Sequence, residues 1–154
     1  MIDTLKILFN RDLKRLISEI EQYKIEADIW KVKGQISNSA GNLCLHLVGN
    51  LNTYIGRELG NTGYLRNREL EFSSKDVPRR ELIQKIESAI AMISQTLDDL
   101  DESLLKDEYP ILVFEHKTST EYLLVHLTTH LTYHLGQINY HRRLIEGDNK
   151  KTTP

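Results

Sequence analysis

Four of the six histidines lie in one short stretch near the C-terminus, and their spacing is that of metal ligands. Read as a helix, residues 125–143 place His126, His130 and His134 at successive i, i+4 positions, and His141 follows on the same face. Neutral imidazole is the commonest side-chain metal ligand, and two imidazoles one turn apart can point at the same ion. We therefore expect His130 and His134 to bind a metal together.

A third ligand has to come from another helix. His46, in the segment LCLHLVGN, is the one histidine on a second predicted helix, so the predicted site is His46, His130 and His134. Metal sites of helical bundles are built in this way, from side chains on facing helices. Three protein ligands leave a coordination position open, which is typical of catalytic rather than structural metal sites.

The remaining histidines and the single cysteine have other expected roles. His126 is interpreted as packing at the site boundary or against a ligand, and a fourth-ligand role is the alternative. His141 lies too far along the helix axis to bind the same ion, and His116 is expected to be exposed in a loop. Cys44 is about 200° round the helix from His46, so we expect a buried thiol in the core rather than a ligand.

Two familiar metal chemistries are excluded by the residues present. Leu131 follows His130 where an HExxH zinc protease requires its glutamate base, and the chain has no Glu-x-x-His pairs of the kind found in di-iron carboxylate bundles.

Polar residues elsewhere have two interpretations each. Asn50, one turn after His46, is expected either to hydrogen-bond near the site or to make a helix contact. The first long connection carries four charged residues, Arg66, Arg68, Glu69 and Glu71. We expect them to form a solvated loop with local ion pairs. The alternative is that they form the mouth of a pocket over the metal and bind an anionic group of the substrate.

Apolar residues recur at helical spacing in four segments, which predict the helices that position these ligands. We expect them at residues 3–23, 43–59, 78–97 and 118–147. Ser37, Asn38 or Ser39 is the expected cap of the second helix, and Thr118 with Glu121 has the spacing of a capping box at the start of the fourth. Long helices joined by long connections favour an all-α four-helix bundle over an α/β fold.

Length and charge narrow the class of protein further. The chain of 154 residues suits one domain, expected at residues 1–147, followed by a polar disordered tail at 148–154. A net charge of −2 and the lack of a long basic run argue against a nucleic-acid partner. The N-terminus has no signal-peptide core and no apolar run is long enough to span a membrane, so with one cysteine we expect a cytoplasmic protein.

Three segments, taken together, resemble a known family. NSAGNLCLHLVGNL around His46, RNRELEF at residues 66–72 and HLTYHLGQINYHRRL at residues 130–144 are similar to the DinB-like superfamily of bacterial metal-binding four-helix bundles, which includes the bacillithiol and mycothiol transferases. The resemblance covers nearly the whole chain. It implies an up-up-down-down bundle, a divalent metal such as zinc or nickel bound by the three histidines above, and a homodimer. For members with known chemistry it implies transfer of a low-molecular-weight thiol, or thiol-dependent isomerisation.

The expected function is therefore that of a metal-dependent thiol S-transferase. The partners would be a small-molecule thiol, deprotonated next to the metal, and an electrophile that the thiolate attacks. A metal-dependent hydrolase is the nearest variant. The alternative from another class is a non-enzymatic, metal-binding or stress-related dimeric bundle.

Overall fold

The computed structural model describes residues 1–149, with the side chains of residues 148 and 149 excepted. Within that range every regular element is helical, apart from one isolated bridge between Glu108 and Ser119, so the all-α prediction is confirmed. The elements are α1 (Ile2–Glu21), a 3-10 turn (Glu26–Trp30), α2 (Ala40–Leu51), which continues as a π-helical segment (Asn52–Arg57), α3 (Arg68–Ser73), α4 (Arg79–Asp99), a second 3-10 turn (Glu102–Lys106) and α5 (Thr120–Asn149).

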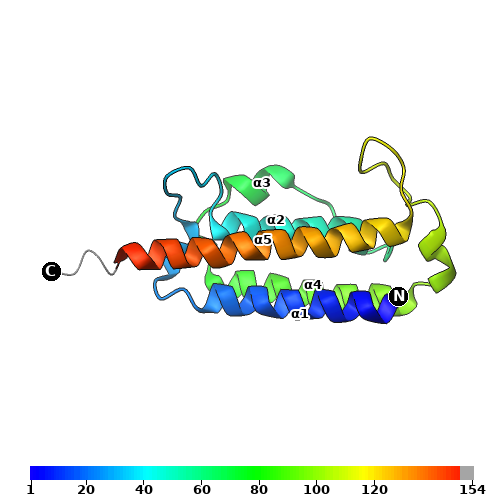
Figure 1. Ribbon diagram of the computed structural model, residues 1–154, viewed down its shortest axis with the longest axis horizontal. Coiled ribbons are helices and arrows are strands. Elements are labelled where there is room, and N and C mark those ends of the chain that lie inside the picture. Colours follow the sequence, from blue (N-terminus) through cyan, green and yellow to red (C-terminus); the bar gives the residue numbers. More distant parts are fainter. Residues whose placement is uncertain (150–154) are drawn as a thin grey trace.

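The four long helices form a bundle in which α1 packs against α4 and α5, and α2 packs against α4 and α5 (Figure 1). Helices α2 and α4 run in one direction, and α1 and α5 run in the other. Taken in chain order, the four long helices therefore run up, down, down and up. The expected order was up-up-down-down, so the prediction of the helix directions is wrong. The connection between α2 and α4 is long enough to travel back along the bundle and carries α3 on the way.

The core is built from the apolar stripes that the sequence shows. In α1 the buried residues recur every three or four positions; they are Leu5, Phe9, Leu13, Leu16 and Ile20. Burying each such side chain contributes about 1.5–3 kcal/mol, so these stripes determine which face of each helix turns inward. No helix among the described residues has both the length and the apolar character of a membrane span.

Caps explain where the two helices that carry the histidine cluster begin. Ser39 caps α2, because its Oγ accepts a hydrogen bond from the Asn42 backbone N–H (3.1 Å). Helix α5 begins at Thr120 rather than Thr118, and Ser119 Oγ accepts from the Tyr122 N–H (3.2 Å). The predicted capping box at Thr118 is wrong because the Thr118 carbonyl accepts the Tyr109 N–H (2.9 Å), which holds Thr118 in the connection.

Other boundaries differ from the predictions by little. Helix α4 begins one residue after Pro78 and ends at Asp99, within the acidic cluster expected to stop it. Helix α5 continues to Asn149, two residues beyond its predicted end, and the rest of the predicted tail lies outside the described residues.

Helix α3 was not predicted, and it is the element that matters most for the site. It lies over α2 (Figure 1) and is only six residues long, too short to show a periodic pattern. Asn67 caps it, since its Oδ1 accepts the Leu70 N–H (3.2 Å). Asn42 of α2 fastens it by donating from Nδ2 to the carbonyl oxygens of Glu71 (3.0 Å) and Ser74 (2.8 Å).

Candidate metal centre

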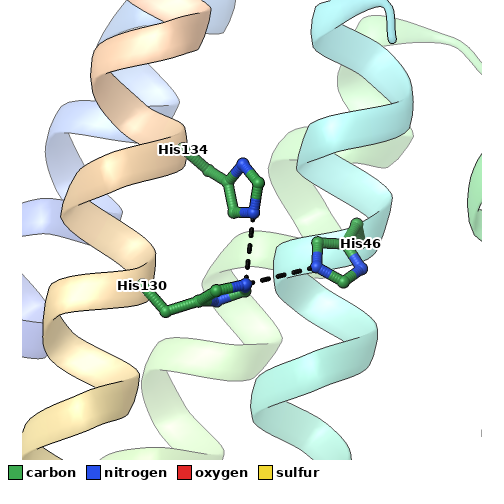
Figure 2. A group of neighbouring side chains, drawn as sticks. All are labelled: His46, His130 and His134. Carbon is green, nitrogen blue, oxygen red and sulfur yellow. Dashed lines mark hydrogen bonds between the residues drawn. The ribbon is translucent and has the colours of Figure 1, made fainter. Parts of the chain in front are cut away.

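The three predicted ligands lie together between α2 and α5 (Figure 2). His130 and His134 project from consecutive turns of α5, and His46 faces them from α2. The Nε2 atom of His130 is 3.4 Å from Nε2 of His46 and 3.1 Å from Nε2 of His134. The structure therefore brings together side chains separated by 84 positions in the chain.

These separations match those of ligands around one ion. Nitrogen ligands at 2.0–2.1 Å from a tetrahedral zinc ion lie about 3.3–3.4 Å from one another, by simple trigonometry. Of the two Nε2 separations, that between His46 and His130 (3.4 Å) falls within this range, and that between His130 and His134 (3.1 Å) is slightly shorter. Small adjustments of the rings would place all three nitrogens on one tetrahedral ion.

Hydrogen bonds on the far side of two rings determine where their protons lie. Nδ1 of His46 is 3.0 Å from Glu71 Oε2, and Nδ1 of His134 is 2.6 Å from Gln137 Oε1. A carboxylate and an amide oxygen are acceptors only, so each Nδ1 carries a hydrogen and donates it. Both Nε2 atoms then present lone pairs to the centre of the cluster, which is the tautomer that a metal ligand requires.

The surroundings also favour the uncharged form of His130 and His46. Burial, followed by the effect of the neighbouring His134, lowers the pKa of His130 to about 4. Burial lowers the pKa of His46 as well, against the opposing effect of the Glu71 carboxylate. Neutral rings with converging lone pairs attract a cation rather than an anion.

The buried Glu71 and the partly buried Arg66 form an ion pair behind His46. Arg66 donates from Nε to Glu71 Oε1 (2.7 Å) and from Nη2 to Oε2 (2.9 Å), so the carboxylate is held in a two-pronged contact while it accepts from His46. The expected local ion pair is present between Arg66 and Glu71, but Glu71 is buried and Arg66 is partly buried, so the expectation that this part of the connection is solvated is wrong for the pair. Arg68 and Glu69 are exposed, as expected.

Gly49 makes this arrangement possible. A Cβ atom added to Gly49 would lie 2.1 Å from Glu71 Oε1 and 2.8 Å from Glu71 Cδ. Helix α2 therefore carries no side chain at the point where the Glu71 carboxylate crosses it to reach His46, one turn away.

The other residues considered from the sequence lie outside the cluster. His126 packs edge-on against Phe114 and stacks on His130, in agreement with a boundary role. His116 is exposed and Cys44 is fully buried, as expected. His141 lies outside the cluster, as expected, but it is buried and both of its ring nitrogens have hydrogen-bond partners. Its Nε2 is 2.9 Å from the Lys31 carbonyl oxygen, and its Nδ1 is 2.6 Å from the Tyr23 hydroxyl.

The sequence analysis assigned no acceptor behind either ring, although it named Glu71 among the residues that could form a mouth over the metal. Gln137 lies three residues after His134, a spacing at which helical side chains meet, and that signal was available. Glu71 had no such local signal, since its contact with His46 depends on the fold of a connection 25 residues away in sequence.

Comparison with known proteins agrees with this fold. Residues 3–153 match the family described as "Protein of unknown function (DUF1572)". The chain belongs to this family. No curated protein matches.

A solved structure titled "Crystal structure of the conserved protein of locus from Enterococcus faecalis" superimposes on this member of the DUF1572 family with a TM-score of 0.77. The match covers 96% of this chain and 98% of the other at 17% sequence identity, so it shows a shared fold.

Proposed function

We propose that His46, His130 and His134 bind one divalent metal ion, with zinc or nickel the best candidates, and that the protein is a DinB-like thiol S-transferase. The observation that carries the proposal is the convergence of the three Nε2 atoms, two of them fixed as lone-pair donors by Glu71 and Gln137. The residues fit such an ion in ligand type, separation and charge state.

A bound divalent ion would supply positive charge that stabilises a thiolate over a thiol at neutral pH. The chain itself supplies the positioning. Glu71 and Arg66 hold the His46 ring, and Gln137 holds the His134 ring, so the nitrogens need little rearrangement on binding.

The nucleophile would come from a co-substrate rather than from the protein. Burial raises the pKa of the Cys44 thiol to about 12, so this side chain is neither ionised nor accessible at neutral pH. In the proposed reaction the sulfur of a small thiol bonds to an electrophilic carbon, the leaving group departs with its electron pair, and the thiol proton passes to solvent.

An open coordination position favours the enzyme over a purely structural metal site. Within the described residues the ligand cluster contains three side chains, and His126 is not among them. A structural zinc site normally has four protein ligands. Hydrolysis at the same site is the nearest alternative, and an assay of thiol consumption against water addition separates the two reactions.

The exposed face of α5 supports the expected homodimer. Five large apolar side chains follow one another along it, each 42% to 69% exposed: Tyr122, Val125, Tyr133, Tyr140 and Leu144. Their exposed area is on the order of 500 Å², a large part of the roughly 800 Å² that each subunit buries in a standard interface. A second copy of this chain, packed α5 against α5, would cover the face. Light scattering of the Tyr133→Lys variant beside the wild type tests this arrangement, since a monomeric wild type would contradict it.

The decisive experiment on the site is elemental analysis of the purified protein beside three variants. We expect near-stoichiometric metal in the wild type and in His126→Ala, and its loss in His46→Ala and His130→Ala with helical circular dichroism retained. A thiol-conjugation assay on the metal-loaded protein follows. A wild type that holds no metal after reconstitution would refute the proposal.

A further inference from the structure

Two buried polar atoms near the site have no hydrogen-bond partner among the described residues. They are Nδ1 of His130 and Oδ1 of Asn50. Such atoms are rare in folded proteins, and each requires an explanation. His46 and His134 both have an acceptor behind the ring, so His130 is the exception among the three ligands.

The two atoms are chemically complementary. If His130 turns its Nε2 lone pair to a metal ion, its hydrogen has to be on Nδ1, which then needs an acceptor. The Oδ1 atom of Asn50 is an acceptor that lacks a donor. Asn50 is 8% exposed, so bulk water is not its partner.

Their positions on the two helices agree. Asn50 follows His46 by one turn, about 6 Å along the axis of α2 and about 40° round it. Helices α2 and α5 are antiparallel (Figure 1), so one turn forward on α2 corresponds to one turn back on α5. His130 is one turn before His134 and lies on that side of the cluster (Figure 2).

We propose that Asn50 is the positioning residue of His130, with its Oδ1 accepting the Nδ1–H of His130 directly or through one buried water when the site holds its ion. Each ligand then has its own acceptor, which is Glu71 for His46, Gln137 for His134 and Asn50 for His130. This inference rests on the proposed metal site and assigns a role to a residue outside the ligand cluster.

The test compares Asn50→Leu, which removes the acceptor at similar volume, with Asn50→Asp, which keeps it. Asn52→Leu is the matched control, because Asn52 is on the same stretch of chain and its Nδ2 donates to the Val48 carbonyl (2.9 Å). The readouts are the zinc Kd by chelator competition, the visible spectrum of the cobalt-loaded protein, and urea unfolding of the metal-free protein.

We expect zinc binding to weaken about 10- to 100-fold in Asn50→Leu, the usual cost of losing such a partner, while the unfolding midpoint of the metal-free protein stays at the wild-type value. Asn50→Asp should bind zinc at least as tightly as the wild type, and Asn52→Leu should bind it equally. The cobalt spectrum should change in Asn50→Leu alone. Asn50→Ala provides a second acceptor-free variant if the leucine does not fold.

Three outcomes would overturn the inference. Wild-type zinc affinity in both acceptor-free variants would remove the role of Asn50 and leave the metal site intact. Weakened binding in Asn50→Asp to the same extent as in Asn50→Leu, with metal-free stability lowered in both, would assign Asn50 to packing between helices. A wild type that binds no zinc or cobalt would overturn the proposed function and this inference with it.

Discussion

Replacing Gly49 with alanine should weaken the proposed metal binding, although Gly49 is not among the proposed ligands. The added Cβ would lie 2.1 Å from Glu71 Oε1, far inside van der Waals contact, and 2.8 Å from Glu71 Cδ. Glu71 would have to rotate away, giving up its bond from His46 and its contact with Arg66. His46 would then lose the acceptor that fixes its tautomer.

Two opposing effects determine the magnitude. Glycine to alanine within a helix ordinarily stabilises by about 0.5–1 kcal/mol. Breaking a buried ion pair costs about 3–5 kcal/mol when one charge is left uncompensated, and the lower end applies here because Arg66 is only partly buried. The second effect is still larger, so we expect Gly49→Ala to lower the free energy of unfolding of the metal-free protein by about 2 kcal/mol. Metal affinity should fall a further ~10- to 100-fold from loss of the acceptor.

The control is Gly136→Ala on α5, where an added Cβ would meet no atom within 4 Å. That variant should gain about 0.5–1 kcal/mol and bind metal as the wild type does. Urea unfolding of the metal-free proteins and zinc competition provide both quantities. If Gly49→Ala were as stable as Gly136→Ala and bound zinc with wild-type affinity, the structural account of Glu71 would be wrong.

Three further predictions concern other parts of the chain. Burial lowers the pKa of His141 in the folded protein, while an unfolded histidine titrates near 6.5, so the unfolded state takes up the proton first and stability falls as pH drops below about 6.5. His141→Gln should show a smaller loss between pH 7 and pH 5 in urea titrations, and an equal loss would contradict this reasoning. Ser39→Ala should destabilise the protein by about 1 kcal/mol through loss of the α2 cap, measured by thermal unfolding; an unchanged melting temperature would refute it. Cys44 should react with a chromogenic disulfide reagent only after denaturant is added, and rapid labelling of the native protein would show that the thiol is accessible.

Much of the fold could be predicted because long amphipathic helices carry their own signal. The apolar stripe of α1, the serine at the start of α2 and the acidic residues at the end of α4 all act locally, and the structure agrees with each of them. The i, i+4 spacing of His130 and His134 is local in the same sense, and it located the cluster correctly.

The parts that sequence reasoning missed depend on contacts between distant segments. The sequence around Glu71 resembles a charged loop, and only the docking of α3 on α2 turns its carboxylate towards His46. His141 was judged only by its distance from His130, whereas its partners, Tyr23 and Lys31, lie more than 100 residues away in the chain. Patterns within one helix do not report such partners.

The division of the proposed ligands into a local pair and a distant third has a consequence for how the protein folds. His130 and His134 come together as soon as one turn of α5 forms, so an ion can bind weakly to that helix before the rest of the chain has folded. His46 joins only when α2 docks on α5, a contact that closes a loop of 84 positions. An ion already bound to α5 would gain His46 as a ligand when α2 docks, and this would stabilise the docked state. Metal availability during synthesis should therefore influence the rate of folding as well as the final stability.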